Sequence, residues 1–380
     1  MQLVFVHGVN TRRDPVGKYD ADVEYRHKCF RDWTLNGADV AFHDPYWGDL
    51  GAHPDKGLIS IPKGPGVAFG GLGAANDITN IEASLDGDVL LRAAREDFGA
   101  VLNTLALREA QSGELGGDEI AQSLAAYAAD YDDMDSPGLS TPAWLDAVDS
   151  DEEFLDRLEV EIGGSQNEVG MGLGNRLKKA GKWIVGGIID LVDGPAEKLV
   201  RKTTPAIAQF LGDVFIYLKQ DSRRDQIRSR VSSSIVAAAK AAESEQKLVV
   251  IGHSMGAIIL YDMLNNPQLV SEMEAKIGSS LKIDLFLTVG TQIGLFEELD
   301  LFTHSQPGVT PGKPPSASLW WHVYNVMDVL SFGVEGVIDD AIQFSVNTKA
   351  NIVDAHGAYF ISPVFHKRLR KRLEKSGLLG

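Results

Sequence analysis

The sequence predicts a doubly wound α/β fold with a mostly parallel sheet, interrupted by one large and mainly helical insertion. Short apolar runs alternate with helical patterns near both ends of the 380-residue chain, as expected of strands joined by crossover helices. These runs are continuous rather than alternating, which is typical of strands buried on both faces. Between them, residues 51–204 carry helical patterns without comparable strands.

The N-terminal part predicts a strand, a helix and a second strand. Residues 3–6, Leu-Val-Phe-Val, form an apolar run that stops at His7-Gly8, as a buried strand does at a backbone turn. Residues 20–35 have a helical pattern, residues 38–42 a strand pattern, and residues 43–48 the turn formers of a loop.

The insertion begins with residues 51–87, whose many glycines and prolines fit a long surface connection better than a packed element. Helical patterns follow at residues 89–109, 118–129 and 144–162. We therefore expect residues 51–204 to form a mainly helical insertion or cap.

Helix and strand patterns alternate again in the C-terminal part. The predicted strands are residues 247–251, 283–289 and 319–326, and the predicted helices are residues 225–242, 256–264 and 367–375. The sequence thus predicts a single α/β core made of residues 1–50 and 205–380.

Composition narrows the classes of function. A net charge of −17 repels a nucleic-acid backbone, so no nucleic-acid partner is expected. The single Cys29 excludes an internal disulfide. The sequence has neither a secretory signal pattern nor an apolar run of about 18 residues, so a cytoplasmic location is the default prediction.

The most specific chemical signal is the motif Gly-His-Ser-Met-Gly at residues 252–256, between a predicted strand and a predicted helix. A nucleophile elbow has this pattern, because a strained turn exposes the serine and the glycines avoid clashes with the strand and helix beside it. Ser254 is therefore the candidate nucleophile. The alternative interpretation is a glycine-rich turn without chemistry.

A serine hydroxyl needs a base, and histidine is the usual one. Three histidines, His304, His322 and His356, follow the motif before His366 of the basic C-terminal helix. We choose His356, because it lies in a loop of small residues, where an imidazole can reach the end of another strand. His304 lies in a proline-rich loop and His322 within a predicted strand, so packed or solvated roles are expected for both.

The base needs an acid to orient it, and Asp328 stands just where a buried strand is predicted to end. A carboxylate there can accept the Nδ1 proton of His356 and fix its tautomer. Asp339, Asp340 and Asp354 remain rivals. The first two resemble a solvated helix start, and Asp354 is close enough to His356 in sequence to act only on the loop.

Acyl transfer also requires backbone N–H groups directed at the developing oxyanion. We predict that Met255, which follows the nucleophile, supplies one N–H, and that Val9, in the loop after the first strand, supplies the other. His7, Asn10 and His253 adjoin these positions and are candidate pocket residues.

With these residues in place, the sequence resembles the α/β-hydrolase superfamily, and within it the bacterial lipase- and esterase-like serine hydrolases that begin with a Val-His-Gly strand. The order Ser254, Asp328, His356 matches the family's nucleophile, acid and base. The resemblance covers residues 1–50 and 205–365. It implies the α/β-hydrolase fold and chemistry without a metal or organic cofactor.

Two features depart from the family pattern. The chain begins on the strand that the family usually places third, which predicts a shortened sheet edge. Residues 288–292, Thr-Val-Gly-Thr-Gln, stand where lipase-like relatives often have Gly-Ser-Pro. This second departure adds Gln292 to the candidate pocket residues.

Residues 170–200 combine an apolar helical stripe with basic residues. The stripe consists of Leu177, Ala180, Ile184, Ile188 and Leu191, flanked by Arg176, Lys178, Lys179, Lys182 and Trp183. Such a helix can act as an interfacial lid that contacts anionic lipid at a membrane surface. An ordinary helix docked on the protein core is the favoured interpretation.

The leading hypothesis is hydrolysis of a carboxylic ester, from a small molecule or a lipid, through an acyl-enzyme on Ser254. An amidase or peptidase would use the same three side chains, so the sequence leaves that alternative open. A third possibility is an interaction protein without catalysis, which would use the helical insertion as its binding surface.

Overall fold

The computed structural model describes residues 1–9, 11–13, 16–53, 89–96, 98–111, 117–131, 141–163, 177–179, 181, 211–219, 221–242, 246–348 and 355–379. The chain divides into two compact units. The first contains Met1–Ala52 and Gln209–Gly380, and the second contains His53–Tyr131 and Leu139–Ala208.

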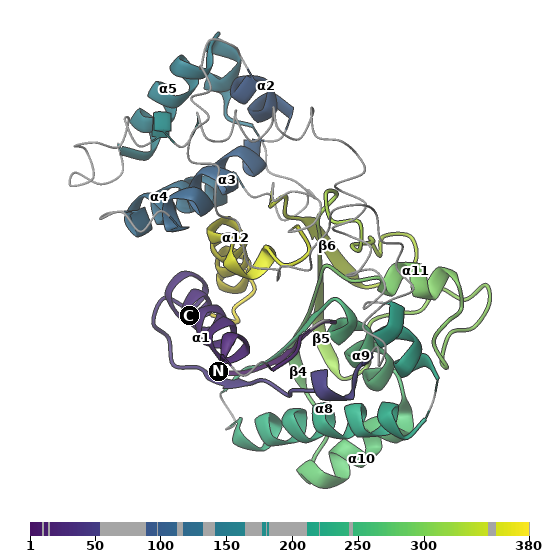
Figure 1. Ribbon diagram of the computed structural model, residues 1–380. Helices are drawn as coiled ribbons and strands as arrows, with labels where there is room; N and C mark the ends of the chain where they lie inside the picture. The colour runs from purple at the N-terminus through teal and green to yellow at the C-terminus, as the bar shows by residue number, and fades with distance from the viewer. Residues whose placement is uncertain are drawn as a thin grey trace, which may run out of the picture. The chain divides into compact units, whose positions relative to one another are not determined.

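The first unit is built on a parallel sheet of six strands, which confirms the α/β class (Figure 1). The strands are β1 (Gln2–Val6), β2 (Ala41–His43), β3 (Leu248–His253), β4 (Ile283–Val289), β5 (Ala317–Tyr324) and β6 (Ala341–Ser345). They lie in the order β2-β1-β3-β4-β5-β6, and every neighbouring pair is parallel. The sequence predicted the first five strands within a few residues and missed β6.

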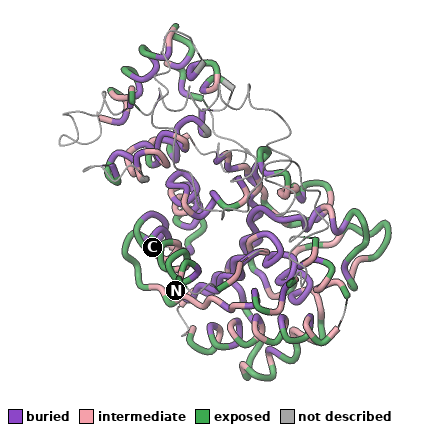
Figure 2. The backbone as a smooth tube through the Cα atoms, viewed as in Figure 1, coloured by how far each residue is buried: buried purple, intermediate pink, exposed green. Residues whose placement is uncertain are grey.

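Helices cover both faces of this sheet. They are α1 (Lys18–Cys29), α8 (Ser222–Ala241), α9 (Met255–Leu264), α10 (Pro267–Ile277), α11 (Ile293–Glu298) and α12 (Pro363–Lys375). Alternate residues of β1 separate the two cores: Val4 and Val6 pack with residues of α8 and α9, whereas Leu3 and Phe5 pack with residues of α12. Both faces are therefore apolar, which explains the continuous hydrophobic runs. Figure 2 colours much of the backbone at the centre of this unit as buried.

Three predicted helices each correspond to two elements in the structure. The helix expected at residues 89–109 is α2 (Val89–Glu96) followed by α3 (Phe98–Gln111). The helix expected at residues 20–35 is α1 followed by a π-helical turn, η1 (Phe30–Thr34). The helix expected at residues 144–162 is a 3₁₀ helix, η3 (Ala143–Ala147), followed by α5 (Asp151–Gly163).

The division between η3 and α5 is explained by residues Ser150 and Glu153. The backbone N–H of Glu153 donates to Ser150 Oγ, and the Glu153 carboxylate accepts from the N–H of Asp149. This is close to a capping box, which begins a new helix at α5.

The described residues of the second unit form helices: α2 (Val89–Glu96), α3 (Phe98–Gln111), α4 (Gly117–Asp130), η3 and α5. Of the basic stripe at residues 170–200, Leu177 is buried, and Lys178 forms ion pairs with Glu152 and Asp156 at 3.0 Å each. Most of that stripe lies outside the described residues, as do residues 54–88. None of the described helices is long and apolar enough to cross a membrane.

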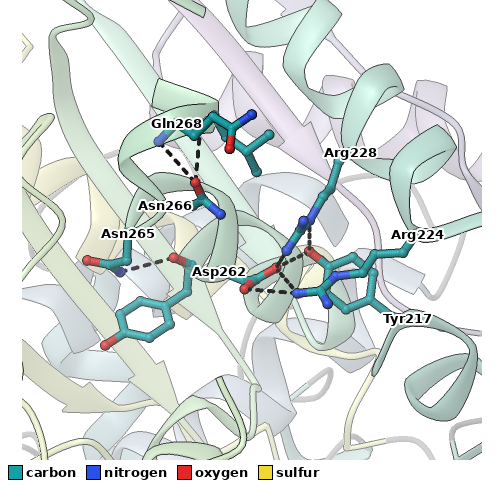
Figure 3. Close-up of polar contacts among 9 residues, drawn as sticks. Tyr217, Arg224, Arg228, Asp262, Asn265, Asn266 and Gln268 are labelled. Atoms are coloured by element: carbon teal, nitrogen blue, oxygen red, sulfur yellow. Dashed lines mark hydrogen bonds and ion pairs between the residues drawn. The ribbon is translucent and has the colours of Figure 1, made fainter. Parts of the chain in front are cut away.

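A buried charge cluster joins α9 to its neighbours (Figure 3). Asp262 of α9 accepts hydrogen bonds from Tyr217 at 2.5 Å, Arg228 at 2.5 Å and Arg224 at 3.2 Å. Tyr217 belongs to a helix at residues 211–218, and both arginines belong to α8. Burial alone would raise the pKa of Asp262, but the hydrogen bonds and positive charges outweigh it and lower that pKa.

We predict that Asp262→Asn lowers the free energy of unfolding by about 3–5 kcal/mol, because it leaves buried arginine charge uncompensated. The exposed Asp49–Arg230 pair provides a control, since Asp49→Asn should cost less than about 1 kcal/mol. Urea denaturation at pH 7 measures both. Because the folded pKa of Asp262 is lowered, its contribution is present above the ordinary carboxyl pKa and is lost as the pH falls through the folded pKa. Equal costs for the two variants would contradict this account.

Candidate active site

Ser254 stands at the turn between β3 and α9 with a strained backbone, at φ 53° and ψ −125°. A Cβ at position 252 would come within 2.4 Å of Ala257 Cα, and one at position 256 within 2.1 Å of the Val6 carbonyl oxygen. Only glycine fits these two positions without a shift of the backbone. Ser254 is 1% exposed, and its Oγ has no hydrogen-bond partner among the described residues.

The loop after β1 lies against this turn. A Cβ at Gly8 would come 2.8 Å from Ser254 Cβ, so the two backbones meet closely. β1 and β3 are neighbours at the point where the chain reverses its direction across the sheet, and ligands of open α/β sheets bind at such points.

Each of the two predicted oxyanion donors directly follows one of the residues in this contact. Val9 follows Gly8 and is half-buried. Met255 is the first residue of α9, so its N–H has no acceptor within the helix. Asn10, a predicted pocket residue, lies outside the described residues.

His7 holds the β1 loop in place. Its Nδ1 lies 2.8 Å from the Gly8 carbonyl oxygen, and its Nε2 accepts from the backbone N–H of Trp47 at 3.1 Å. The rings of His7 and Trp47 stack with their centroids 4.9 Å apart. Burial lowers the pKa of His7 to about 3, so the ring stays neutral and keeps both hydrogen bonds. His7 thus has a structural role in the β1 loop, which lies against the turn at Ser254.

Asp328 and His356 form a close pair at the carboxyl edge of the sheet. His356 Nδ1 lies 2.9 Å and 3.1 Å from the two carboxylate oxygens of Asp328. Tyr359 and the backbone N–H of Leu330 each donate to the same carboxylate at 3.0 Å. His356 Nε2 is buried and has no hydrogen-bond partner within the described part of the chain.

Tyr359 is a component of the site that the sequence reasoning missed. Burial, followed by the charge of Asp328, raises the pKa of Tyr359, so its hydroxyl remains a donor. Gly290, at φ 57°, leaves room for it, since a Cβ there would come 2.8 Å from the tyrosine ring. The only sequence signal was a tyrosine three residues after His356.

The remaining two predicted pocket residues, Gln292 and His253, contact the segments that carry Asp328 and His356. Gln292 is buried, its Nε2 donates to the Leu330 carbonyl oxygen, and its Oε1 has no partner among the described residues. His253 Nε2 lies 2.8 Å from the carbonyl oxygen of His356.

His322 and His304, the other candidate bases, contact groups other than Asp328. His322 is buried, with Nδ1 2.9 Å from Thr288 Oγ1 and Nε2 2.8 Å from the Phe332 carbonyl oxygen. His304 lies 3.4 Å from Glu297 and stacks on Phe302, and neither of its buried ring nitrogens has a hydrogen-bond partner among the described residues.

The rival acids do not form a comparable pair. Asp339 and Asp340 are exposed, and Asp354 lies outside the described residues. The described structure therefore brings His356 together with Asp328.

No family model matches this sequence, and neither curated proteins nor solved structures give a match. Among the described residues, no group of three or more histidine, cysteine, aspartate or glutamate side chains is arranged to hold a metal ion.

We predict that the free energy of unfolding falls as the pH drops from 7 to 5. Burial lowers the pKa of His7 to about 3 and the pKa values of His322 and His366 to about 4. The unfolded chain therefore takes up protons first, and stability is lost as the pH falls below about 6.5 towards the folded values, at about 1.4 kcal/mol per pH unit for each group.

Urea denaturation at pH 7, 6 and 5 measures this slope. His366→Gln removes one of the titrating groups, so its slope should be smaller than that of the unaltered protein. An unfolding free energy that stays constant over this range would rule out the neutral buried histidines.

Proposed function

We propose that this protein is a serine hydrolase of the α/β-hydrolase superfamily that cleaves carboxylic esters through an acyl-enzyme on Ser254. One observation carries the proposal: Ser254 Oγ and His356 Nε2 are both buried without a hydrogen-bond partner among the described residues, while Asp328 holds the other ring nitrogen. Buried polar atoms are normally paired, and two unpaired ones in a single site suggest groups reserved for chemistry.

The first half-reaction acylates the serine. A carboxylate only accepts, so His356 Nδ1 donates to Asp328 and Nε2 carries the lone pair. His356 Nε2 takes the Ser254 Oγ proton as Oγ attacks the ester carbonyl carbon, and the N–H groups of Met255 and Val9 stabilise the oxyanion. The intermediate expels the alcohol, which receives that proton from Nε2. The acyl group remains on Ser254.

The second half-reaction releases the acid. Water attacks the acyl-enzyme as His356 Nε2 accepts one of its protons, and the carboxylic acid leaves when Ser254 Oγ recovers that proton. Each step uses only these side chains, backbone N–H groups and water.

Apolar side chains beside the acid support an ester with an apolar part. Val326, Met327 and Val329 surround Asp328 in sequence and are 73%, 41% and 57% exposed. Exposed apolar residues gathered at one place often mark a binding surface. Small-molecule or lipid esters are thus the proposed substrates, and cytoplasmic action remains part of the proposal. Membrane-surface contact through residues 170–200 stays a prediction.

We expect Ser254→Ala to reduce kcat for p-nitrophenyl acetate by about 10⁶-fold, since it removes the nucleophile. Ser233 is an exposed serine of α8, so Ser233→Ala serves as the control and should match the unaltered protein. Initial rates at pH 8 measure both, and a matched panel of p-nitroanilides separates ester from amide cleavage. Full activity in Ser254→Ala would end the proposal.

We expect Asp328→Asn to lower kcat by about 10⁴-fold, because an amide can fix the wrong tautomer of His356. Asp340→Asn tests an exposed rival and should leave kcat unchanged. The same p-nitrophenyl acetate assay compares the two variants. A larger loss in Asp340→Asn than in Asp328→Asn would show that the acid is wrongly identified.

A further inference from the structure

His253 makes a contact that is not explained by the motif at residues 252–256 or by the roles proposed for Ser254, Asp328 and His356. It is the last residue of β3 and directly precedes Ser254. Its Nε2 lies 2.8 Å from the backbone carbonyl oxygen of His356, 103 positions along the chain. A carbonyl oxygen only accepts, so Nε2 carries the hydrogen and donates it.

The His253 ring is also enclosed by aromatic groups of the base segment. Its centroid lies 4.8 Å from that of His356, at an interplanar angle of 35°. Phe360 meets it edge-on at 5.3 Å, and Tyr359 lies at 6.3 Å. The β1 loop also lies close to this ring, since a Cβ at Gly8 would come 3.3 Å from His253 Nδ1. Three segments of the site thus meet at this ring.

His356 is thus held by two hydrogen bonds. Asp328 holds the Nδ1 atom of its side chain, and His253 holds the carbonyl of its backbone. If the hydrogen bond from its ring to Asp328 were the only one, the His356 Nε2 atom could still move relative to Ser254 whenever the backbone at His356 moved. The second bond ties that backbone to the residue next to the nucleophile.

We propose that His253 is a positioning residue that sets the placement of the base His356 relative to the nucleophile Ser254. This inference rests on the proposed function and deepens it. Acyl transfer is sensitive to displacements of about 1 Å, which can cost about 100-fold in rate.

The charge state of His253 is consistent with this role. Burial, followed by the charge of His356, lowers the pKa of His253 well below its ordinary value. A neutral ring keeps Nδ1 without a proton and avoids repulsion when His356 becomes an imidazolium during the reaction.

The test compares two substitutions that differ in the donor. His253→Gln places an amide Nε2 at the same number of bonds from the backbone, and His253→Leu keeps apolar volume without a donor. With p-nitrophenyl acetate, we expect His253→Leu to lower kcat by about 100-fold with KM changed by less than about twofold, and His253→Gln to retain most of the rate. Thermal midpoints of the two variants should be similar.

Each outcome distinguishes the inference from the proposed function. If the unaltered protein turns over the ester and His253→Leu matches it, the positioning role is wrong and the hydrolase proposal stands. Equal losses in the leucine and glutamine variants would mean that packing, not the hydrogen bond, matters, which also overturns the role. An unaltered protein without ester turnover overturns both.

A second measurement does not depend on whether the leucine variant folds. In ¹⁵N-histidine-labelled unaltered protein at pH 7, the His253 resonance, identified by its absence in His253→Gln, should have a protonated Nε2 and an unprotonated Nδ1. Protonation at Nδ1, or at both nitrogens, would contradict the inference.

Discussion

The site depends on one backbone constraint, the left-handed turn at Ser254. A non-glycine residue at φ 53° and ψ −125° is strained, at a cost on the order of 1–3 kcal/mol. Close packing compensates for this cost: glycines at 252 and 256 allow β3 and α9 to approach each other and β1. Because Val6 pairs with Gly252 in register, β1 and β3 end level, and Gly8 reaches Ser254.

The same sheet edge brings the segments that carry Asp328 and His356 to this turn. β5 and β6 run parallel to the other strands of the sheet, so Asp328, which follows β5, and His356, which follows β6, emerge at the same edge as Ser254. There Asp328 is 2% exposed, and its carboxylate accepts from three groups. Pairing in this form lets a buried carboxylate remain charged. The buried carboxylate of Asp328 thus depends on one donor from its own turn and on two donors, His356 and Tyr359, from a later segment of the chain.

The sequence predicted the features that depend on local pattern. Apolar runs identified β1, β3, β4 and β5 because both faces of the sheet are covered, and the motif at residues 252–256 identified the turn between β3 and α9. β6 was missed because Ala-Ile-Gln-Phe-Ser is a short edge strand with only Phe344 buried, so its pattern is weak. The start of α5 was missed although Ser150 and Glu153 carry the signature of a capping box.

Contacts between distant segments could not be predicted from the sequence. Tyr359 to Asp328, Gln292 to Leu330 and His253 to His356 all join segments that meet only when the sheet is complete. The pairing of Asp328 with His356, in contrast, could be predicted, because the ends of strands in a parallel sheet lie at one edge. Their pairing is seen in the structure, whereas their catalytic roles remain proposals.

The most direct test of the central claim is reaction with a fluorophosphonate, followed by mass spectrometry of the intact protein and its peptides. We predict one adduct per chain, located on Ser254 and lost when His356 is replaced by alanine. A protein that is folded and yet unlabelled, or labelled at a different residue, would contradict the claim that Ser254 is an activated nucleophile.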